Sequence, residues 1–298
     1  MLEADLARLE AKVLDAAAGG WLAAIDEIRA LLAAESPLVR ARILALVAPD
    51  VDSALLRGVK AALGLGIGDA AALVNQLGRR KLDTLGAIKA TPSPAAKALA
   101  GGLTVAGRDA LAIARKLTAA GDLLAATAPL FAHAAKVRRQ TTDGLNLAAN
   151  QGVTSVADAA GVPTVWQAET NACVHCLAYS GIYAQPGKSF PGGLTYGAKS
   201  YHLDPVATPP RHPNCRCTVE PLFSLEYAAA LRREADRSVL RGFSLEGESM
   251  KVRIEAAERL VAKGVDAPKS VVAYSRKSVA AGKFPTRGRP VDGPTQAP

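Results

Sequence analysis

The feature that most constrains the fold is a proline-rich segment that contains every cysteine of the 298-residue chain. Residues 161–222 hold eight of the 18 prolines, and the four cysteines lie within it in two short stretches, NACVHC and RHPNCRC. A loop-rich stretch of about fifty residues is not ordered by an apolar core of its own. Such a segment needs a cross-link, and the clustered cysteines can supply one.

The residue types and spacings predict that the cross-link is a metal ion. Cys173-x-x-Cys176 allows two thiolates to reach one ion from a tight turn, and His212, Cys215 and Cys217 offer three further donors. A structural zinc ion takes four ligands, usually in tetrahedral geometry. The sequence therefore predicts a structural Zn²⁺ site. Five candidates compete for four places, so both a Cys₄ and a Cys₃His set remain open.

Three alternatives remain for these cysteines. They could be reduced thiols with a packing role, disulfides, or a redox Cys-x-x-Cys pair. The amino-terminus has neither the basic nor the apolar region of a secretory signal. Synthesis in a reducing cytoplasm is therefore expected, and it disfavours disulfides. A thioredoxin-like βαβ context is missing around Cys173, which disfavours the redox pair. His175, between the first two cysteines, is expected to point away from the metal.

Outside this segment the pattern is helical. Hydrophobic residues make up 49% of the chain but aromatic residues only 4%, which favours helix packing over a β-sandwich. Apolar residues recur at intervals of three and four, as in Trp21, Ile25 and Ile28. Gly19-Gly20 and the stretch GLGIGD at 64–69 are expected to interrupt helices. The second stretch lacks the spacing and the Gly-Lys-Ser/Thr of a phosphate loop.

The predicted fold class is mainly α, with a small α+β, loop-rich module. We expect a helical region at 1–100, a module with the Cys/His cluster at 101–222, helices at 223–265 and a basic, disordered tail at 266–298. Two short strands are predicted within the module, at TVWQAET and CTVEPL. After it, helices are predicted at SLEYAAALRREADRSVLRG and at ESMKVRIEAAERLVAKG.

The charge distribution bears on partners. The net charge is +9, and the basic excess grows toward the carboxyl terminus. This permits contact with DNA through the tail at 266–298 but does not require it. The longest apolar run contains Pro129 and is far shorter than the ~20 residues that span a bilayer. The chain is therefore expected to be soluble, with no membrane partner and no small-molecule substrate.

Several of these residues together resemble a known family. Its hallmarks are a Trp before a short acidic stretch and Cys-x-x-Cys, a Gly, a Phe-Pro pair and a final His-Pro-x-Cys-Arg-Cys. The corresponding residues are Trp166, Glu169, Cys173, Cys176, Gly181, Phe190-Pro191 and His212 to Cys217. Over about residues 105–222 the chain resembles the phage Mu F-like (MuF domain) minor head or head morphogenesis proteins. Two departures stand out: Thr170 replaces a usual aspartate, and an Arg-Thr-Glu element is reduced to Arg139 with Thr141 or Thr142.

The resemblance implies a minor capsid protein of a tailed bacteriophage or prophage. Such a protein assists head assembly near the portal and is linked to DNA packaging or ejection. Its implied partners are the portal and the major capsid or scaffold proteins. Its implied location is the virion, in the capsid interior or at the portal vertex, with assembly in the host cytoplasm.

The alternative function is an enzyme, because some members of this family are fused to protease or toxin domains. A metal-dependent hydrolase, a nuclease or a protease would need a base and an open coordination position. His202, Asp204 and Glu169 are the nearby candidates, and Gly-x-Ser-x-Gly is absent. His133 follows Phe131 on a predicted helix and is expected to be a packed or surface histidine. No catalytic residue is therefore predicted.

Overall fold

A computed structural model describes residues 2–76, 91–169, 172–243 and 248–284. Of the described residues, 66% are helical, which confirms the mainly α prediction with a small sheet and a loop-rich module. The chain forms two compact units. The first comprises residues 1–166, 183–190 and 206–223, and the second comprises 167–182, 191–205 and 224–298. None of the described helices combines the length and apolar character needed to cross a bilayer.

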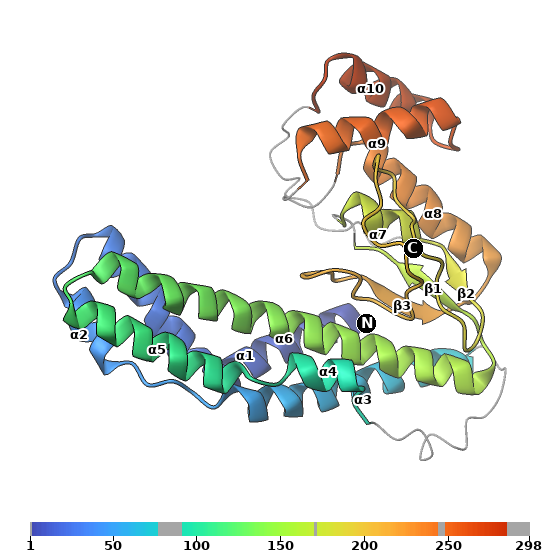
Figure 1. Cartoon of the computed structure of the whole chain (residues 1–298). Helices are drawn as coiled ribbons and strands as arrows, with labels where there is room; N and C mark the ends of the chain where they lie inside the picture. The colour runs from blue at the N-terminus through green and yellow to red at the C-terminus, as the bar shows by residue number, and fades with distance from the viewer. Residues whose placement is uncertain (1, 77–90, 170–171, 244–247, 285–298) are drawn as a thin grey trace. The chain divides into compact units, whose positions relative to one another are not determined.

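The first unit is built on long helices that lie side by side (Figure 1). The 38-residue helix α6 packs against α1, α3, α4 and α5, and its Pro129 is accommodated within the helix. The core between these helices consists mostly of Ala, Leu and Val side chains. The helices of this unit are α1 (Leu2–Ala33), α2 (Leu38–Ala45), α3 (Val51–Gln76), α4 (Pro94–Leu99), α5 (Leu103–Ala119) and α6 (Leu123–Ala160).

Glycines continue these helices rather than interrupt them, so the predicted breaks are wrong. Helix α1 runs through Gly19-Gly20, and α3 runs through GLGIGD. Gly66 of α3 lies so close to α6 that an added Cβ would be 1.9 Å from the carbonyl oxygen of Ala149. At Gly152 of α6 an added Cβ would be 2.4 Å from the carbonyl oxygen of Leu63. The two backbones thus touch where neither helix has a side chain, and this packing outweighs the low helix propensity of glycine.

A small sheet with strand order β2-β1-β3 completes the first unit. Strands β1 (Thr164–Gln167) and β3 (Thr218–Pro221) fall within the two predicted segments, while β2 (Tyr183–Ala184) was not expected. Strands β1 and β2 are antiparallel, with Thr164 opposite Ala184. Trp166 is fully buried and meets Phe190 edge to face, with 5.3 Å between the ring centroids. The Trp and Phe of the family pattern therefore form one aromatic contact beside the sheet.

The second unit contains α7 (Val174–Tyr179), α8 (Leu225–Leu240), α9 (Met250–Lys263) and α10 (Lys269–Ala280). Helices α8 and α9 fall within the two predicted segments, and α9 ends at Gly264 as predicted. Both helices begin at side-chain caps, from Ser224 and Ser249. Helix α10 corrects the predicted disorder of the 266–298 tail. Its Val271, Ser275 and Ser278 are buried, and the helix packs against α8 and α9. Residues 285–298 of the predicted tail lie outside the described residues.

Candidate metal centre

The five predicted metal ligands lie close together and could bind a metal ion. The ligand atoms of Cys173, Cys176 and His212 all lie within 4.8 Å of one another, and so do the sulfurs of Cys176, Cys215 and Cys217. Cys176 belongs to both groups. The four cysteines are buried and none forms a disulfide. Two short stretches that are far apart in the sequence thus supply one cluster of donors.

The RHPNCRC stretch is held by one polar face of α6. Asp143, Asn146 and Asn150 follow one another at intervals of three and four residues and are all buried. The Asn146 side-chain amide donates hydrogen bonds to the carbonyl oxygens of Cys215 (2.7 Å) and Cys217 (3.2 Å). These bonds fix the backbone from which both sulfurs project.

Asn150 extends this support into strand β3. Its amide nitrogen donates to the Cys217 carbonyl at 3.2 Å, and its side-chain oxygen accepts from the backbone N–H of Val219 at 2.8 Å. A buried amide that donates and accepts in this way leaves little freedom to the segment it binds. The position of Cys217 is therefore set by the helix and the strand together.

Asp143 binds the turn that precedes Cys215. Its carboxylate accepts a hydrogen bond from the backbone N–H of Asn214 at 2.7 Å. Asn214 has a positive φ of 61°, a conformation that asparagine tolerates better than most residues. Burial raises the pKa of Asp143, while the Asn214 amide opposes that rise. The nearby Cys215 also raises the pKa of Asp143, as expected where negative charge gathers.

His212 is positioned as a nitrogen ligand. Its Nδ1 lies 2.9 Å from the carbonyl oxygen of Pro213. A carbonyl oxygen can only accept, so in the neutral ring Nδ1 carries the hydrogen and Nε2 carries the lone pair. A hydrogen bond from the other ring nitrogen to a backbone carbonyl is the usual way in which a ligating histidine is oriented.

The NACVHC stretch presents its two cysteines through a helix start. Cys173 is the N-cap of α7, and its sulfur accepts from the backbone N–H of Cys176 at 3.4 Å. The sulfurs of Cys173 and Cys176 lie within 4.8 Å of each other. The backbone N–H of Val174 donates to the Glu248 carboxylate at 3.2 Å. At the other end of α7, Gly181 takes a positive φ of 75°.

The donor set fits a zinc ion. Tetrahedral zinc with bonds of about 2.3 Å to sulfur places neighbouring sulfurs about 3.8 Å apart. In each of the two groups the ligand atoms lie within 4.8 Å of one another, a limit that includes this spacing. Thiolates and imidazoles are ligands that zinc prefers, whereas magnesium and calcium prefer oxygen. When bound, the ion would act as a cross-link, held by Cys173 and Cys176 with two of His212, Cys215 and Cys217.

Other predicted residues lie outside the cluster. The His175 ring meets the Tyr201 ring at 6.0 Å between centroids and belongs to neither ligand group. His202 and Asp204 are exposed, and Glu169 is half-buried. Among the described residues, none of these three belongs to a group that could hold a metal ion.

His133 is a packed histidine, one of the two alternatives expected from the sequence. It is buried in the first unit and meets Trp21 edge to face at 5.0 Å between centroids. Burial lowers its pKa, and the charge of Lys136 lowers it further. A neutral ring at physiological pH is consistent with this packing role.

The supporting residues Asp143, Asn146 and Asn150 were missed at the sequence level. Their signal was available: three polar residues repeat on one face of a helix that is otherwise rich in Ala, Leu and Val. Such a stripe indicates a buried polar contact. The partner of this stripe, the RHPNCRC stretch about 70 residues further along the chain, cannot be deduced from periodicity.

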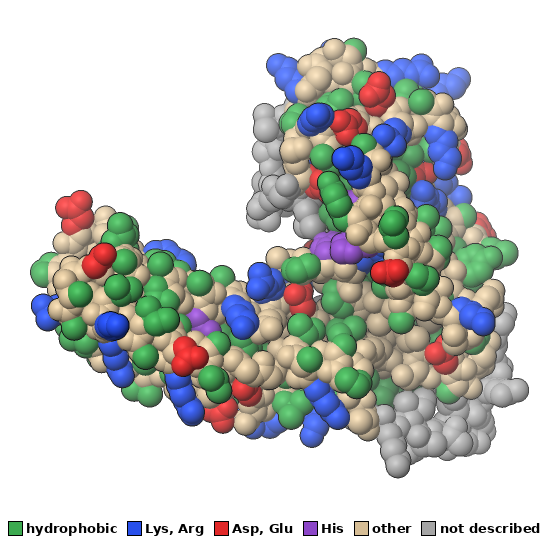
Figure 2. All heavy atoms as spheres, viewed as in Figure 1, with side chains coloured by type: hydrophobic (Ala, Val, Ile, Leu, Met, Phe, Trp, Pro, Cys, Tyr) green, Lys and Arg blue, Asp and Glu red, His purple; other side chains and the backbone are tan. Residues whose placement is uncertain are grey.

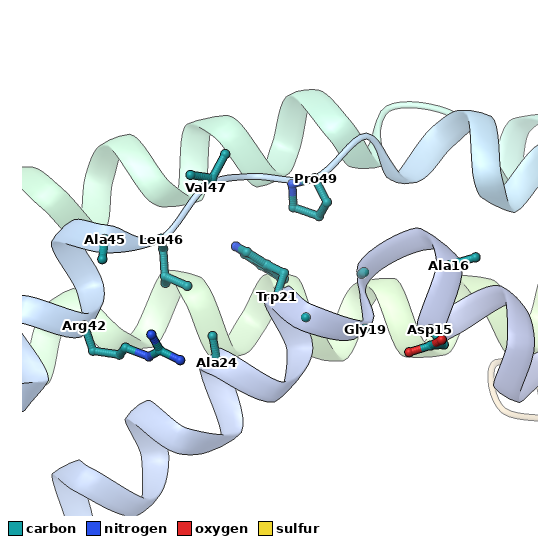
Figure 3. A pocket seen from close by; sticks show the side chains of 12 residues that line it. Asp15, Ala16, Gly19, Trp21, Ala24, Arg42, Ala45, Leu46, Val47 and Pro49 are labelled. Atoms are coloured by element: carbon teal, nitrogen blue, oxygen red, sulfur yellow. The ribbon is translucent and has the colours of Figure 1, made fainter.

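A separate pocket of about 530 Å³ lies in the first unit, between α1 and the segment that follows α2. Figure 3 shows Trp21 and Leu46 extending into it, with Asp15 and Arg42 at opposite ends of the view. Arg42 is paired with Glu27 at 2.5 Å. The residues that line the pocket include neither a histidine nor a cysteine, so it offers no nucleophile–base pair.

Comparisons with known proteins identify no relative. No family model matches the chain, and no curated protein or solved structure shows significant similarity to it. The geometry of the cluster is therefore the basis for a functional proposal, together with the sequence pattern described above.

Proposed function

We propose that this chain is a minor capsid or head morphogenesis protein of a tailed bacteriophage or prophage, with a structural zinc site in its central module. The observation that carries the proposal is that the five donors of Cys-x-x-Cys and His-Pro-Asn-Cys-Arg-Cys lie close together, in two groups of three that share Cys176. The same residues carry the resemblance to MuF-like head proteins. In this proposal the protein acts near the portal during head assembly, with portal, major capsid or scaffold proteins as partners.

The zinc ion serves as a cross-link rather than as a catalyst. Catalytic zinc keeps an open position for water, and three protein ligands are usual. Here five candidate donors lie close together and the four cysteines are buried. Structural zinc contributes an apparent ~10–16 kcal/mol in small zinc peptides at neutral pH, and this binding energy favours folding. In this proposal that energy adds to the burial of apolar side chains in the proline-rich stretch, among them Trp166, Tyr179 and Phe190.

Metal analysis tests the zinc part of the proposal. Protein purified without added metal is expected to contain about one equivalent of zinc by elemental analysis, and X-ray absorption is expected to show sulfur-rich, four-coordinate zinc. Folded protein with less than about a tenth of an equivalent of any metal would exclude a structural site. The His212→Ala variant distinguishes the two ligand sets, because only a Cys₃His site loses a nitrogen ligand.

Head association tests the biological role. The tagged chain is expressed during phage production in the bacterium that encodes it, and heads are separated from free protein on a density gradient. We expect the chain to sediment with portal-containing particles at low copy number. Complete absence from both assembling and mature heads would contradict the proposal, whatever the metal content.

A further inference from the structure

The second unit carries a basic helix face that neither the metal centre nor the packing of the unit uses. The exposed residues of α10 are Lys269, Ser270, Ala273, Arg276, Lys277 and Ala280. At 100° per residue they occupy roughly a third of the helix circumference. Val271, Ser275 and Ser278 are buried on the remaining surface. In Figure 2, several Lys and Arg side chains lie on the part of the surface where Figure 1 places α10.

The charge on this face has one sign. Helix α10 contains no acidic residue, whereas α9 carries Glu255 and Glu258 in addition to its cations. Within the described part of the chain, Lys269, Arg276 and Lys277 form no ion pair. The three cations extend over about 12 Å of helix. Exposed Lys283 follows the helix directly.

We propose that this face of α10 binds the phosphate backbone of double-stranded DNA without sequence preference. Duplex DNA carries one negative charge per ~1.7 Å of its axis. A row of cations on a helix can therefore contact phosphates at many positions along the duplex. Between the cations stand only Ala and Ser, and these small side chains let the helix approach the backbone closely. Backbone contacts of this type position a protein but carry no sequence information.

The face does not suit other polyanions equally well. Single-stranded nucleic acids are usually bound by stacking of bases on exposed aromatic rings. The aromatic residue of α10, Tyr274, instead lies against Phe284, with 6.4 Å between ring centroids. A membrane surface is bound by basic helices that also present large apolar side chains, and this face has none. The proposal rests on the charge distribution and is independent of the head-assembly role.

The test is fluorescence anisotropy of a labelled random-sequence duplex with the full-length protein over a salt series. The variant Lys269→Gln/Arg276→Gln/Lys277→Gln removes the three cations and keeps good helix formers. The matched control is Arg40→Gln/Lys60→Gln/Arg108→Gln. It removes three exposed cations of the first unit that form no ion pair with another described residue, and it changes the net charge equally. Circular dichroism and thermal unfolding establish that both variants are folded.

We expect the α10 variant to bind on the order of tenfold or more weakly at 0.1 M salt, and its salt slope to fall by about 2.7, at ~0.9 for each phosphate contact. The control is expected to bind like the unmodified protein. Equal binding by both variants would overturn the proposal. So would a loss of binding in Arg287→Gln/Arg289→Gln instead, or tighter binding to single-stranded DNA or to anionic vesicles than to the duplex.

Discussion

The close contact of α3 and α6 predicts that glycine-to-alanine substitutions in α3 have opposite effects on stability at positions only two residues apart. We expect Gly66→Ala to destabilise the first unit, and the same substitution at Gly64 or Gly68 to stabilise it slightly. Gly66 is buried against the carbonyl of Ala149, while an added Cβ at Gly64 or Gly68 meets nothing within 4 Å. Helix propensity alone would predict the same gain at all three positions.

The magnitude follows from the overlap. An added Cβ at Gly66 would be 1.9 Å from the Ala149 oxygen, about 1.5 Å short of an ordinary contact. The atom it meets belongs to the helix backbone, so relief requires the two helices to separate. Overpacking of this kind lowers the free energy of unfolding by ~3 kcal/mol at the upper end. The higher helix propensity of alanine offsets ~0.5–1 kcal/mol of this loss. The net expectation is a loss of ~2 kcal/mol, or roughly 4–8 °C in melting temperature for a unit of this size.

Tryptophan fluorescence during urea and thermal unfolding is the assay. Both tryptophans of the chain, Trp21 and Trp166, lie in the first unit, so the signal reports on that unit. Gly64→Ala is expected to gain ~0.5–1 kcal/mol in the free energy of unfolding. If Gly66→Ala and Gly64→Ala shift the midpoint in the same direction by similar amounts, the proposed close contact is refuted.

Three further predictions concern the metal centre and the core. Cys176→Ser is expected to abolish zinc binding and to expose the module to proteolysis, because Cys176 belongs to both ligand groups; His175→Ala is the control that keeps the metal. Asn150→Ala leaves the N–H of Val219 without its side-chain partner and removes one of the two amides that donate to the carbonyl of Cys217. We expect it to lower the free energy of unfolding by ~1–3 kcal/mol, measured in urea. His133→Gln is expected to reduce the loss of stability on acidification. Burial lowers the pKa of His133, so below pH ~6.5 the unfolded chain takes up a proton that the folded chain does not.

Each of these three has an outcome that contradicts it. Full zinc occupancy in the cysteine variant would remove Cys176 from the ligand set. A change of less than ~0.5 kcal/mol for the asparagine variant would mean that water replaces its hydrogen bonds. Identical stability curves between pH 7.5 and 5.5 for the unmodified protein and the histidine variant would show that the folded ring accepts a proton without cost.

The helical class and several helix ends could be predicted because their causes are local. Ser224 and Ser249 cap their helices by bonding backbone groups three residues ahead, and Gly264 ends α9 through its left-handed conformation. The cysteine spacing was equally informative, because ligands that share a turn must approach one ion together. Such signals involve only a few neighbouring residues, so they can be recognised in the sequence without knowledge of the fold.

Long-range packing decided the rest. By sequence Gly66 is a helix breaker, and only the approach of α6 makes it a contact residue. From the sequence, Asn146 is only a polar residue in a helix. The fold brings the carbonyl of Cys215, 69 positions later, within hydrogen-bond distance of its side chain. Helix α10 lies in the tail that was predicted to be disordered, yet its buried residues hold it within the second unit. The sequence by itself predicted the helical class, most of the helices and the five candidate metal donors, because these depend on neighbours in the chain. The tertiary structure alone decided which backbones touch and which polar groups support the donors, because those energies arise between segments far apart in sequence.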